Sequence, residues 1–265
     1  MSIIEHLQKI KQDNDAQKAR RQTSGKNIWH NWKDGDQVVR FVGDVVITKT
    51  YWIAKSNFNK LALFPDSAFE GEGALPKTIN CANWNIETEK FEDKGDILSL
   101  LNKIAREVLK VGGTLDAETK DKFELLKRRT DTQTTYRWNI IDRDEPKDEN
   151  GQPKGYLITN IGFELFDDLM AIHGDYQPSL FTSPDEGIDI KVSKTINNGN
   201  TKSRADPLLK RGSMVISPLT EEERQWELLN IKDICGKQTD QDLLFSKLLP
   251  EWQDLINDYR SNEGK

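Results

Sequence analysis

The chain has 265 residues, of which 35% are hydrophobic and 31% charged, and its formal net charge is −6. No apolar run approaches the roughly 18–20 residues that a bilayer-spanning helix needs, and the charged N-terminal stretch is unlike a secretory signal, so the sequence excludes both classes. The two cysteines, Cys81 and Cys235, form no CxxC pair, which favours a reduced, cytoplasmic compartment.

The first 25 residues predict a short helix and an arm. Ile3, Ile4, Leu7 and Ile10 have helical spacing, and an apolar stripe this short has to pack on this chain or on a neighbour. Residues 18–26 then combine cations and hydroxyls with few apolar side chains. We expect a flexible basic arm there.

Two strands follow at residues 37–48 and 50–53, because Val, Ile and aromatic residues dominate both stretches. Gly43 predicts a bulge or a tight turn within this region. Residues 56–95 are expected to be loop-rich with short β pieces.

The second of these strands carries candidate surface residues. Lys49, Tyr51 and Lys55 have a spacing that allows one shared outward surface, whereas Phe41 and Trp52 favour packing in the core. We include Tyr51 and Lys55 among the candidate nucleic-acid contacts described below.

Two helices are predicted next. Asp96 is an N-cap for a helix with one apolar stripe, which Gly112 and Gly113 end. A second helix covers residues 116–126 and leads directly into Lys127.

Residues 127–144 are the most informative stretch. It begins with three cations, Lys127, Arg128 and Arg129, and a hydroxyl-rich step starts at Thr130. A strand follows in which aromatic or apolar residues alternate with polar ones: Tyr136, Arg137, Trp138, Asn139 and Ile140. Cations attract the phosphates of a nucleic acid, and aromatic rings stack on unpaired bases, each contributing about 1–3 kcal/mol. The stretch therefore predicts binding of single-stranded nucleic acid. A half-buried strand with Tyr136 and Trp138 in the core and Arg137 in solvent fits the same pattern.

After a polar turn at residues 145–155, the pattern predicts a strand at 156–160, a helix at 163–172 and a strand at 188–196. Residues 197–211 are expected to form a flexible basic loop.

The chain is acidic and helical beyond Pro218. Thr220 and Glu223 have the spacing of a capping box. Asp240 and Pro250 each begin a further short helix.

Charge is distributed unevenly along the chain. Residues 127–143 hold five cations and two acids, and residues 189–212 hold six cations and two acids. Residues 219–265 hold six cations and eleven acids. Because a ligand responds to the local field more than to the total charge, a basic centre with an acidic C-terminal region is compatible with a polyanionic partner.

Enzymatic motifs are scarce. The sequence has no P-loop, dinucleotide-binding fingerprint, nucleophile elbow or HExxH motif. With three histidines and two cysteines, the chain can scarcely supply a catalytic triad or a zinc site. The pairs Asp142/Asp144 and Asp167/Asp168 leave open a Mg²⁺ site or, for the first pair, a nuclease, although solvated charge is the other interpretation. We expect no cofactor, no metal and no enzymatic activity.

About five short strands interrupted by helices favour a small, partly open barrel over a parallel sheet. We therefore expect an α+β protein with an OB-fold-like, partly open β-barrel core and helical insertions. Residues 1–25 would form the arm, residues 26–217 the core with an insert at 56–126, and residues 218–265 an acidic helical region that binds partners.

The chain resembles the single-stranded DNA-binding proteins of tailed phages, typified by the T-even helix-destabilising protein. The matching stretches are VVRFV at 38–42, KRRT at 127–130, TYRWNII at 135–141, RDEPKDENGQPKGY at 143–156 and EGIDIKVSKTI at 186–196. They cover under half of the chain. The chain is also similar in size and tail character to the single-stranded DNA-binding proteins of the schitovirus group, which are short-tailed phages.

The resemblance implies an OB-fold that binds single-stranded DNA without reading sequence, in phage replication and recombination inside the infected bacterial cell. It implies DNA contacts at the basic, hydroxyl-bearing element and the aromatic strand after it: Lys127, Arg128, Arg129, Thr130 and Tyr136. It also implies self-association along DNA through a basic arm, here Lys18, Arg20 and Arg21.

The acidic C-terminal region of this family recruits partners, and in the schitovirus group the protein is implicated in late transcription by host RNA polymerase. We therefore expect replication or recombination proteins or host RNA polymerase to bind the C-terminal region here. Here the last residues are mixed in charge, which argues against recruitment by a purely acidic tip. The T-even protein also holds zinc between its first strands and its basic element. Because that interval has only Cys81 and no histidine here, we expect the insert at 56–126 in its place.

The expected DNA contacts are cations that follow phosphates and rings that stack on bases. The cations are Lys55, Lys127, Arg128, Arg129, Arg137, Lys191, Lys194, Lys202 and Arg204, and the rings are Tyr136 with Tyr51, Trp138 or Tyr156. The acidic region is expected to fold over the basic cleft when DNA is absent. The alternative is a protein-interaction module or transcription accessory factor whose C-terminal helices bind polymerase and whose β core is a scaffold.

Overall fold

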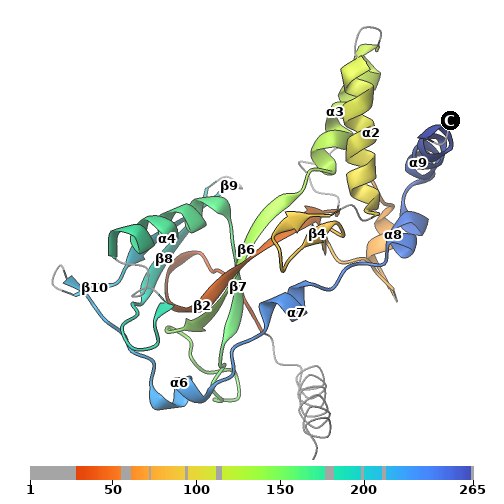
Figure 1. Ribbon diagram of the computed structural model, residues 1–265. Coiled ribbons are helices and arrows are strands. Elements are labelled where there is room, and N and C mark those ends of the chain that lie inside the picture. Colours follow the sequence, from red (N-terminus) through yellow and green to blue (C-terminus); the bar gives the residue numbers. More distant parts are fainter. Residues whose placement is uncertain are drawn as a thin grey trace, which may run out of the picture.

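The structure is a computed structural model that describes residues 28–54, 61–71, 73–92, 95–111, 115–176, 182–197, 200–210 and 213–263 (Figure 1). The predicted N-terminal helix and arm, with Lys18, Arg20 and Arg21, lie outside the described residues, as does Lys55. None of the helices within these ranges is long and apolar enough to cross a membrane.

Strands and helices occur in separate runs and the pairing in the main sheet is largely antiparallel, which makes the protein α+β as expected. The strands are β1 (Trp29–His30), β2 (Gly35–Trp52), β3 (Thr78–Asn80), β4 (Trp84–Asn85), β5 (Lys90–Phe91), β6 (Gln133–Asp142), β7 (Leu157–Ile161), β8 (Ile190–Asn197), β9 (Asn200–Pro207), β10 (Leu209–Lys210) and β11 (Ser213–Met214). The helices are a 3-10 turn (Asp66–Phe69), α2 (Ile97–Val111), α3 (Ala117–Arg129), α4 (Phe163–Tyr176), α6 (Glu221–Gln225), α7 (Ile231–Cys235), α8 (Gln241–Lys247) and α9 (Pro250–Glu263).

Strand β2 organises the main sheet, whose strand order is β1-β7-β6-β2-β8-β9, with β3 also paired to β2. It is a single strand, not the two predicted ones, and it pairs first with β8, then with β6 and at its end with β3. Gly43 has φ +72°, and the register with β6 shifts nearby, so the predicted bulge is confirmed. The described strands do not close into a barrel.

Two sequence predictions about local structure are wrong. Residues 197–211, expected to be a loop, include β9, which pairs with β8 along its length. Of its described side chains only Ala205 is buried, so the sequence lacks the apolar alternation that marks a strand. The run Lys127–Arg129 is the last turn of α3 and not a step after it.

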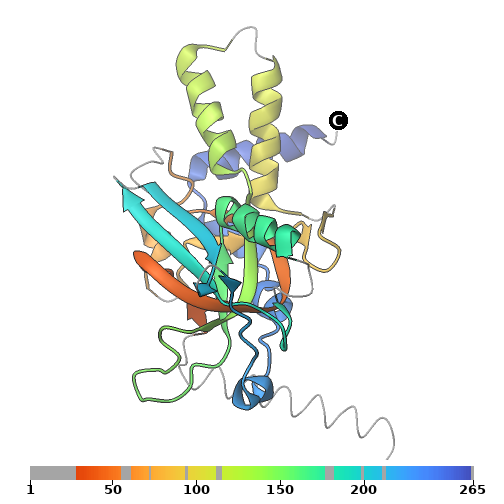
Figure 2. The same cartoon turned by 90° about the vertical axis from the view of Figure 1, so that its left-hand side faces the viewer.

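Alternate residues of β6 face two different cores. On one face, Tyr136, Trp138 and Ile140 pack with β8, β9 and α4, and Figure 2 shows α4 lying across this face. On the other face, Ile141 packs with Ile158 of β7 and with residues from the C-terminal segment. A central strand covered on both sides has no solvent face.

The C-terminal segment packs against both the sheet and the insert. We call residues 219–239, which include α6 and α7, the strap; it runs along one face of β2, β6 and β7 (Figure 1). Beyond the strap, Trp252 and Ile256 of α9 are 2% and 0% exposed in a core shared with α2 and α3. The acidic region therefore folds together with the rest of the chain.

Candidate nucleic-acid interface

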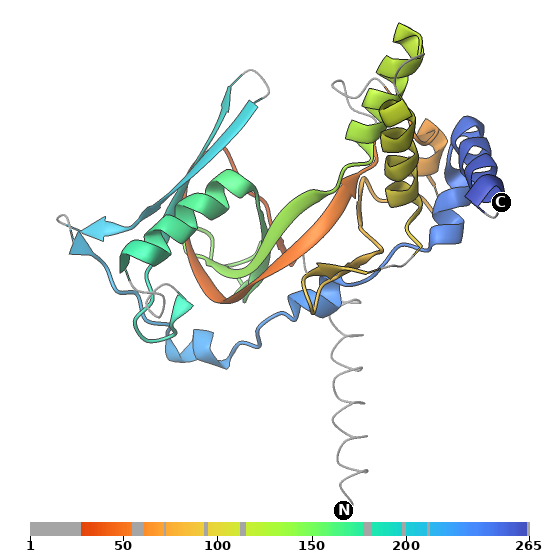
Figure 3. The same cartoon turned by 45° about the horizontal axis from the view of Figure 1, so that its top comes forward.

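The predicted cations that remain exposed lie on two arms. The β8–β9 hairpin forms the hairpin arm, and the α2–α3 pair forms the helix arm. Both arms rise on the same side of β2 and β6 (Figures 1 and 3). The strap lies on the opposite side.

The hairpin arm carries Lys191, Lys194, Lys202 and Arg204. Lys202 and Arg204 are exposed, and Arg204 is held by its strand neighbour Asp206 at 3.0 Å. Lys191 forms an ion pair with Asp36 at 3.3 Å. Lys194 donates to the carbonyl of Trp32 at 2.8 Å. Exposed pairs of this kind are weak, so these cations can exchange their partners for phosphates.

The helix arm presents cations at the end of α3. Arg128 is exposed, and Lys127 lies 3.8 Å from Glu124, one turn earlier. Cations in the last turn also interact favourably with the helix dipole.

Arg129 holds the helix arm onto the sheet, and Thr130 closes the end of α3. The buried Arg129 guanidinium donates to the carbonyls of Leu61, Trp52, Ile53 and Ala54 at 3.0–3.3 Å, and burial lowers its pKa. Thr130 is 2% exposed and donates to the carbonyl of Leu126 at 2.8 Å. We correct their predicted role as DNA contacts, because the Arg129 guanidinium joins α3 to β2 and the Thr130 hydroxyl is bonded within α3 and to Asn102 of α2.

The four rings predicted to stack on bases are in the core. Their exposed fractions are 1% for Tyr51, 9% for Tyr136, 4% for Trp138 and 6% for Tyr156. Tyr136 already stacks on Phe166, with ring centroids 3.7 Å apart and planes at 3°. Trp138 donates its indole N–H to the carbonyl of Gly43 at 2.8 Å. We correct their predicted role, because in this structure they leave no ring face for a base. The alternative prediction, which placed Tyr136 and Trp138 in the core, is correct for these two rings, since both faces of β6 are covered.

Arg137 is also buried, at 8% exposed, and does not face solvent. Its Nε donates to Asn160 Oδ1 at 3.2 Å, and its guanidinium lies 5.7 Å from the ring centroid of Trp29. It lies on the face that the strap covers, beside the Cys235 thiol, whose pKa is raised mainly by burial.

The strap is bound to this face by specific contacts. Asn139 donates to the carbonyl of Leu229 at 3.0 Å and accepts the N–H of the same residue at 3.2 Å. Glu223 forms an ion pair with Arg143, and the Tyr156 hydroxyl donates to the Glu223 carbonyl at 3.1 Å. The expected acidic cover therefore lies over a mostly apolar sheet face, and not over the exposed cations of the two arms.

A pocket that no sequence pattern predicted lies on the edge of β2. Along that edge, β2 pairs with β8 as far as Val39 and with β3 from Thr50. Between them, the Trp84 indole N–H donates to the Ile47 carbonyl at 3.1 Å, and the Cys81 N–H donates to the Lys49 carbonyl at 2.8 Å. The insert thus supplies the hydrogen bonds that a strand would have made.

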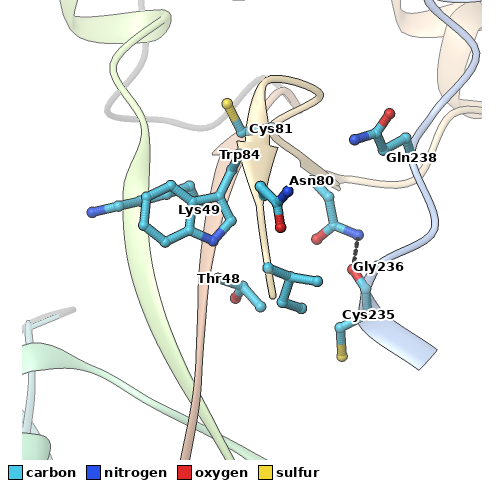
Figure 4. A pocket seen from close by; sticks show the side chains of 10 residues that line it. Thr48, Lys49, Asn80, Cys81, Trp84, Cys235, Gly236 and Gln238 are labelled. Atoms are coloured by element: carbon cyan, nitrogen blue, oxygen red, sulfur yellow. Dashed lines mark hydrogen bonds between the residues drawn. The ribbon is translucent and has the colours of Figure 1, made fainter. Parts of the chain in front are cut away.

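This pocket has a volume of about 160 Å³ (Figure 4). It is lined by Thr48, Lys49, Asn80, Cys81, Trp84, Asn85, Ile86, Cys235, Gly236 and Gln238. Lys49 Nζ lies 5.3 Å from the Trp84 ring centroid and donates to Thr134 at 2.6 Å. Burial raises the pKa of the Cys81 thiol to about 11, so the lining is neutral except for one cation.

The only sequence signal for this pocket was the amide-rich run TINCANWN at 78–85, which periodicity assigns to short β pieces. This run forms one wall of the pocket, and residues 235, 236 and 238 form the opposite wall. The pocket therefore depends on the tertiary structure.

Three of the four acids that the sequence left open as Mg²⁺ ligands have structural partners: Asp142, Asp144 and Asp168, which accepts the Ala205 N–H at 3.1 Å. Asp142 accepts the backbone N–H groups of Asp144 and Glu145 at 3.2 and 2.9 Å, and Asp144 accepts that of Val38 at 2.7 Å. Among the described residues, no group of three His, Cys, Asp or Glu side chains is placed to hold a metal ion.

Comparison of the sequence with protein-family models and with curated proteins finds no match.

Proposed function

We propose that the protein binds single-stranded DNA without reading its sequence, through a core related to the OB-fold. In support of this, β2 pairs with both β6 and β8 within the set β2, β6, β7, β8 and β9, and α4 lies between β7 and β8 in the chain. The OB-fold also has five strands, which form a partly open barrel. The described chain differs from a closed OB barrel at β7, whose outer edge pairs with β1.

OB-folds bind oligonucleotides with strands 2 and 3 and with the loops that join strands 1 to 2 and 4 to 5. The corresponding loops here are the insert between β2 and β6, which carries the helix arm, and the end of the β8–β9 hairpin. In this protein the strap covers the sheet face that corresponds to the strand 2–3 surface of an OB-fold. The proposed DNA contacts therefore come from the two arms.

The observation that carries the proposal is that both arms, whose sequences include the exposed cations, lie on one side of the β2–β6 pair (Figure 3). A flexible polyanion that runs from one arm to the other meets Lys202 and Arg204 at one end and Lys127 and Arg128 at the other. A double helix is far stiffer, with a persistence length of about 150 base pairs, and is a poorer fit to two separate arms. The contacts are charges and not base edges, so binding tolerates any sequence.

The stacking rings in this proposal differ from those suggested by the sequence. Trp52, at the end of β2, is 40% exposed. Its carbonyl accepts a hydrogen bond from Arg129, so it lies where the helix arm joins the sheet. Trp84 is half-buried at the pocket on the same strand's edge.

The resemblance to phage single-stranded DNA-binding proteins extends the proposal to replication and recombination, with self-association through residues 1–25. Contact with host RNA polymerase through the C-terminal helices belongs to the same proposal. If oligonucleotides are not retained, the protein-interaction module is the better hypothesis.

A fluorescence titration with oligo(dT) of several lengths at two salt concentrations tests the proposal. If about five phosphates are neutralised, log K should fall against log salt with a slope near −3.5, from roughly −0.7 per contact. The double variant Lys202→Glu/Arg204→Glu should bind several-fold more weakly and with a shallower slope. Lys147→Glu, in the exposed polar turn, is the matched control; equal losses in both variants, or no binding by the wild type, would contradict the proposal.

A further inference from the structure

The pocket on the edge of β2 has the size of a single aromatic ring. Its volume is about 160 Å³. A cavity of roughly 150 Å³ in another protein accepts benzene, whereas sites for drug-sized ligands usually measure about 300–1,000 Å³. A one-ring heterocycle fits, and a whole nucleotide or a two-ring base does not.

The polar groups of the pocket suit the edge of a pyrimidine. Asn80 uses its amide nitrogen to donate to the carbonyls of Cys235 and Lys237 at 2.6 and 2.9 Å, and Gln238 uses its own to donate to Ala82 at 2.7 Å. Among the described residues, neither amide oxygen accepts a hydrogen bond, and both side chains line the pocket (Figure 4). Carbonyl oxygens fixed in this way can accept the N–H groups of a pyrimidine.

The remaining walls supply stacking and charge. Trp84 offers an aromatic surface, fixed by its hydrogen bond to Ile47. Lys49 uses one hydrogen bond on Thr134, and an ammonium group has three donors. It can therefore also contact an adjoining phosphate. No carboxylate lines the pocket to repel one.

The position of the pocket agrees with the path across the arms. Thr48 and Lys49 lie on β2 between its pairing with β8, which belongs to the hairpin arm, and Trp52, where the helix arm joins. A strand that follows β2 from one arm to the other passes this edge.

From these observations, the geometry points to a binding site for one unpaired pyrimidine base, which turns out of the bound strand into the pocket between Trp84 and the end of the strap. This inference rests on the proposed function. It adds that the C-terminal strap forms one wall of the DNA site, through Gly236 and Gln238.

Photo-crosslinking tests this directly. An oligo(dT) carrying one 4-thiothymidine is bound to the full chain and irradiated, and tryptic peptides are mapped by mass spectrometry. We expect adducts in the peptides 78–90 and 238–247, which hold the two opposite walls. Adducts found only in other peptides, with binding intact, would overturn the pocket and leave the proposed function standing.

Two variants separate the base from the phosphate. Gln238→Leu, at an exposed position, should weaken oligo(dT) binding on the order of five- to tenfold with an unchanged salt slope, because it removes an uncharged contact. Lys49→Met should make the slope shallower by about 0.7. Gln225→Leu, an exposed glutamine of α6 in the same strap, is the control and should bind like the wild type.

Circular dichroism of each variant should match the wild type. Wild-type affinity in folded Gln238→Leu would overturn the inference. Failure of the wild type itself to bind any oligonucleotide would overturn both the inference and the proposed function.

Discussion

The sheet and the two arms divide most of the predicted DNA contacts by chemical type, and the buried Arg129 and Arg137 are the exceptions. The predicted aromatic rings of the sheet are buried: Tyr136 and Trp138 lie under α4, and Tyr156 lies under the strap. The arms carry cations that are exposed, among them Arg128, Lys202 and Arg204. Moving an aromatic ring out of water lowers the free energy, whereas moving a charge out of water raises it. Rings and cations from the same stretch of sequence therefore lie in different parts of the molecule.

The largest expected effect is on the sheet side of this comparison. Tyr136→Ala should lower the free energy of unfolding by about 3–5 kcal/mol, because it removes a buried ring stacked on Phe166. The folded fraction should bind oligo(dT) like the wild type. Urea denaturation and native titration measure the two quantities, with Tyr136→Phe as the control; a binding defect in stably folded protein would mean that the ring contacts DNA.

The adjacent residues Arg128 and Arg129 give the sharpest comparison. Arg129→Met should cost about 3 kcal/mol of stability, because it leaves the carbonyls that Arg129 bonds, among them those of Trp52 and Ile53, without their donor. Arg128→Met should change stability by less than about 0.5 kcal/mol and instead weaken DNA binding. Thermal unfolding and salt-dependent titration separate the two variants, and a reversed result would refute the division between sheet and arms.

Asn139→Ala tests how the strap is held. It should cost about 1–3 kcal/mol, because the buried N–H and carbonyl of Leu229 both lose their partner. Hydrogen exchange in residues 219–239 should rise more than exchange in α4. Asn150→Ala, in the exposed polar turn, serves as control, and equal exchange in both variants would show that apolar contacts alone hold the strap.

The smallest expected effect is pH dependence from His30. Burial lowers the pKa of His30 below its ordinary value of 6.5, despite the nearby Asp142 carboxylate at 3.7 Å. The unfolded chain therefore takes up the proton more readily, so His30 contributes stability above pH 6.5 that is lost as the pH falls towards the folded pKa. Between pH 7.5 and 5.5, wild-type stability should fall by up to about 1.4 kcal/mol per pH unit for one proton.

His30→Gln should flatten that part of the stability curve. Urea denaturation at several pH values measures the slope of each protein. Identical slopes in the variant and the wild type would show that another group is responsible.

The sequence by itself determined the features that depend on neighbours along the chain. The capping box of Thr220 and Glu223 forms as predicted, and Asp96 accepts the N–H of Ser99 at 2.7 Å at the start of α2. Caps and helical periodicity involve residues three or four positions apart, so they can be read without the fold. The bulge at Gly43 follows for the same local reason.

Only the tertiary structure decided which side chains reach solvent. Alternation along β6 shows that the strand has two faces, but Leu229, which covers one of them, lies 90 residues away from Asn139. The pocket beside Trp84 likewise depends on residues that are distant in sequence, since residues 235, 236 and 238 form one of its walls. Burial is a property of what packs against a residue, and for this chain those partners come from the insert and the strap.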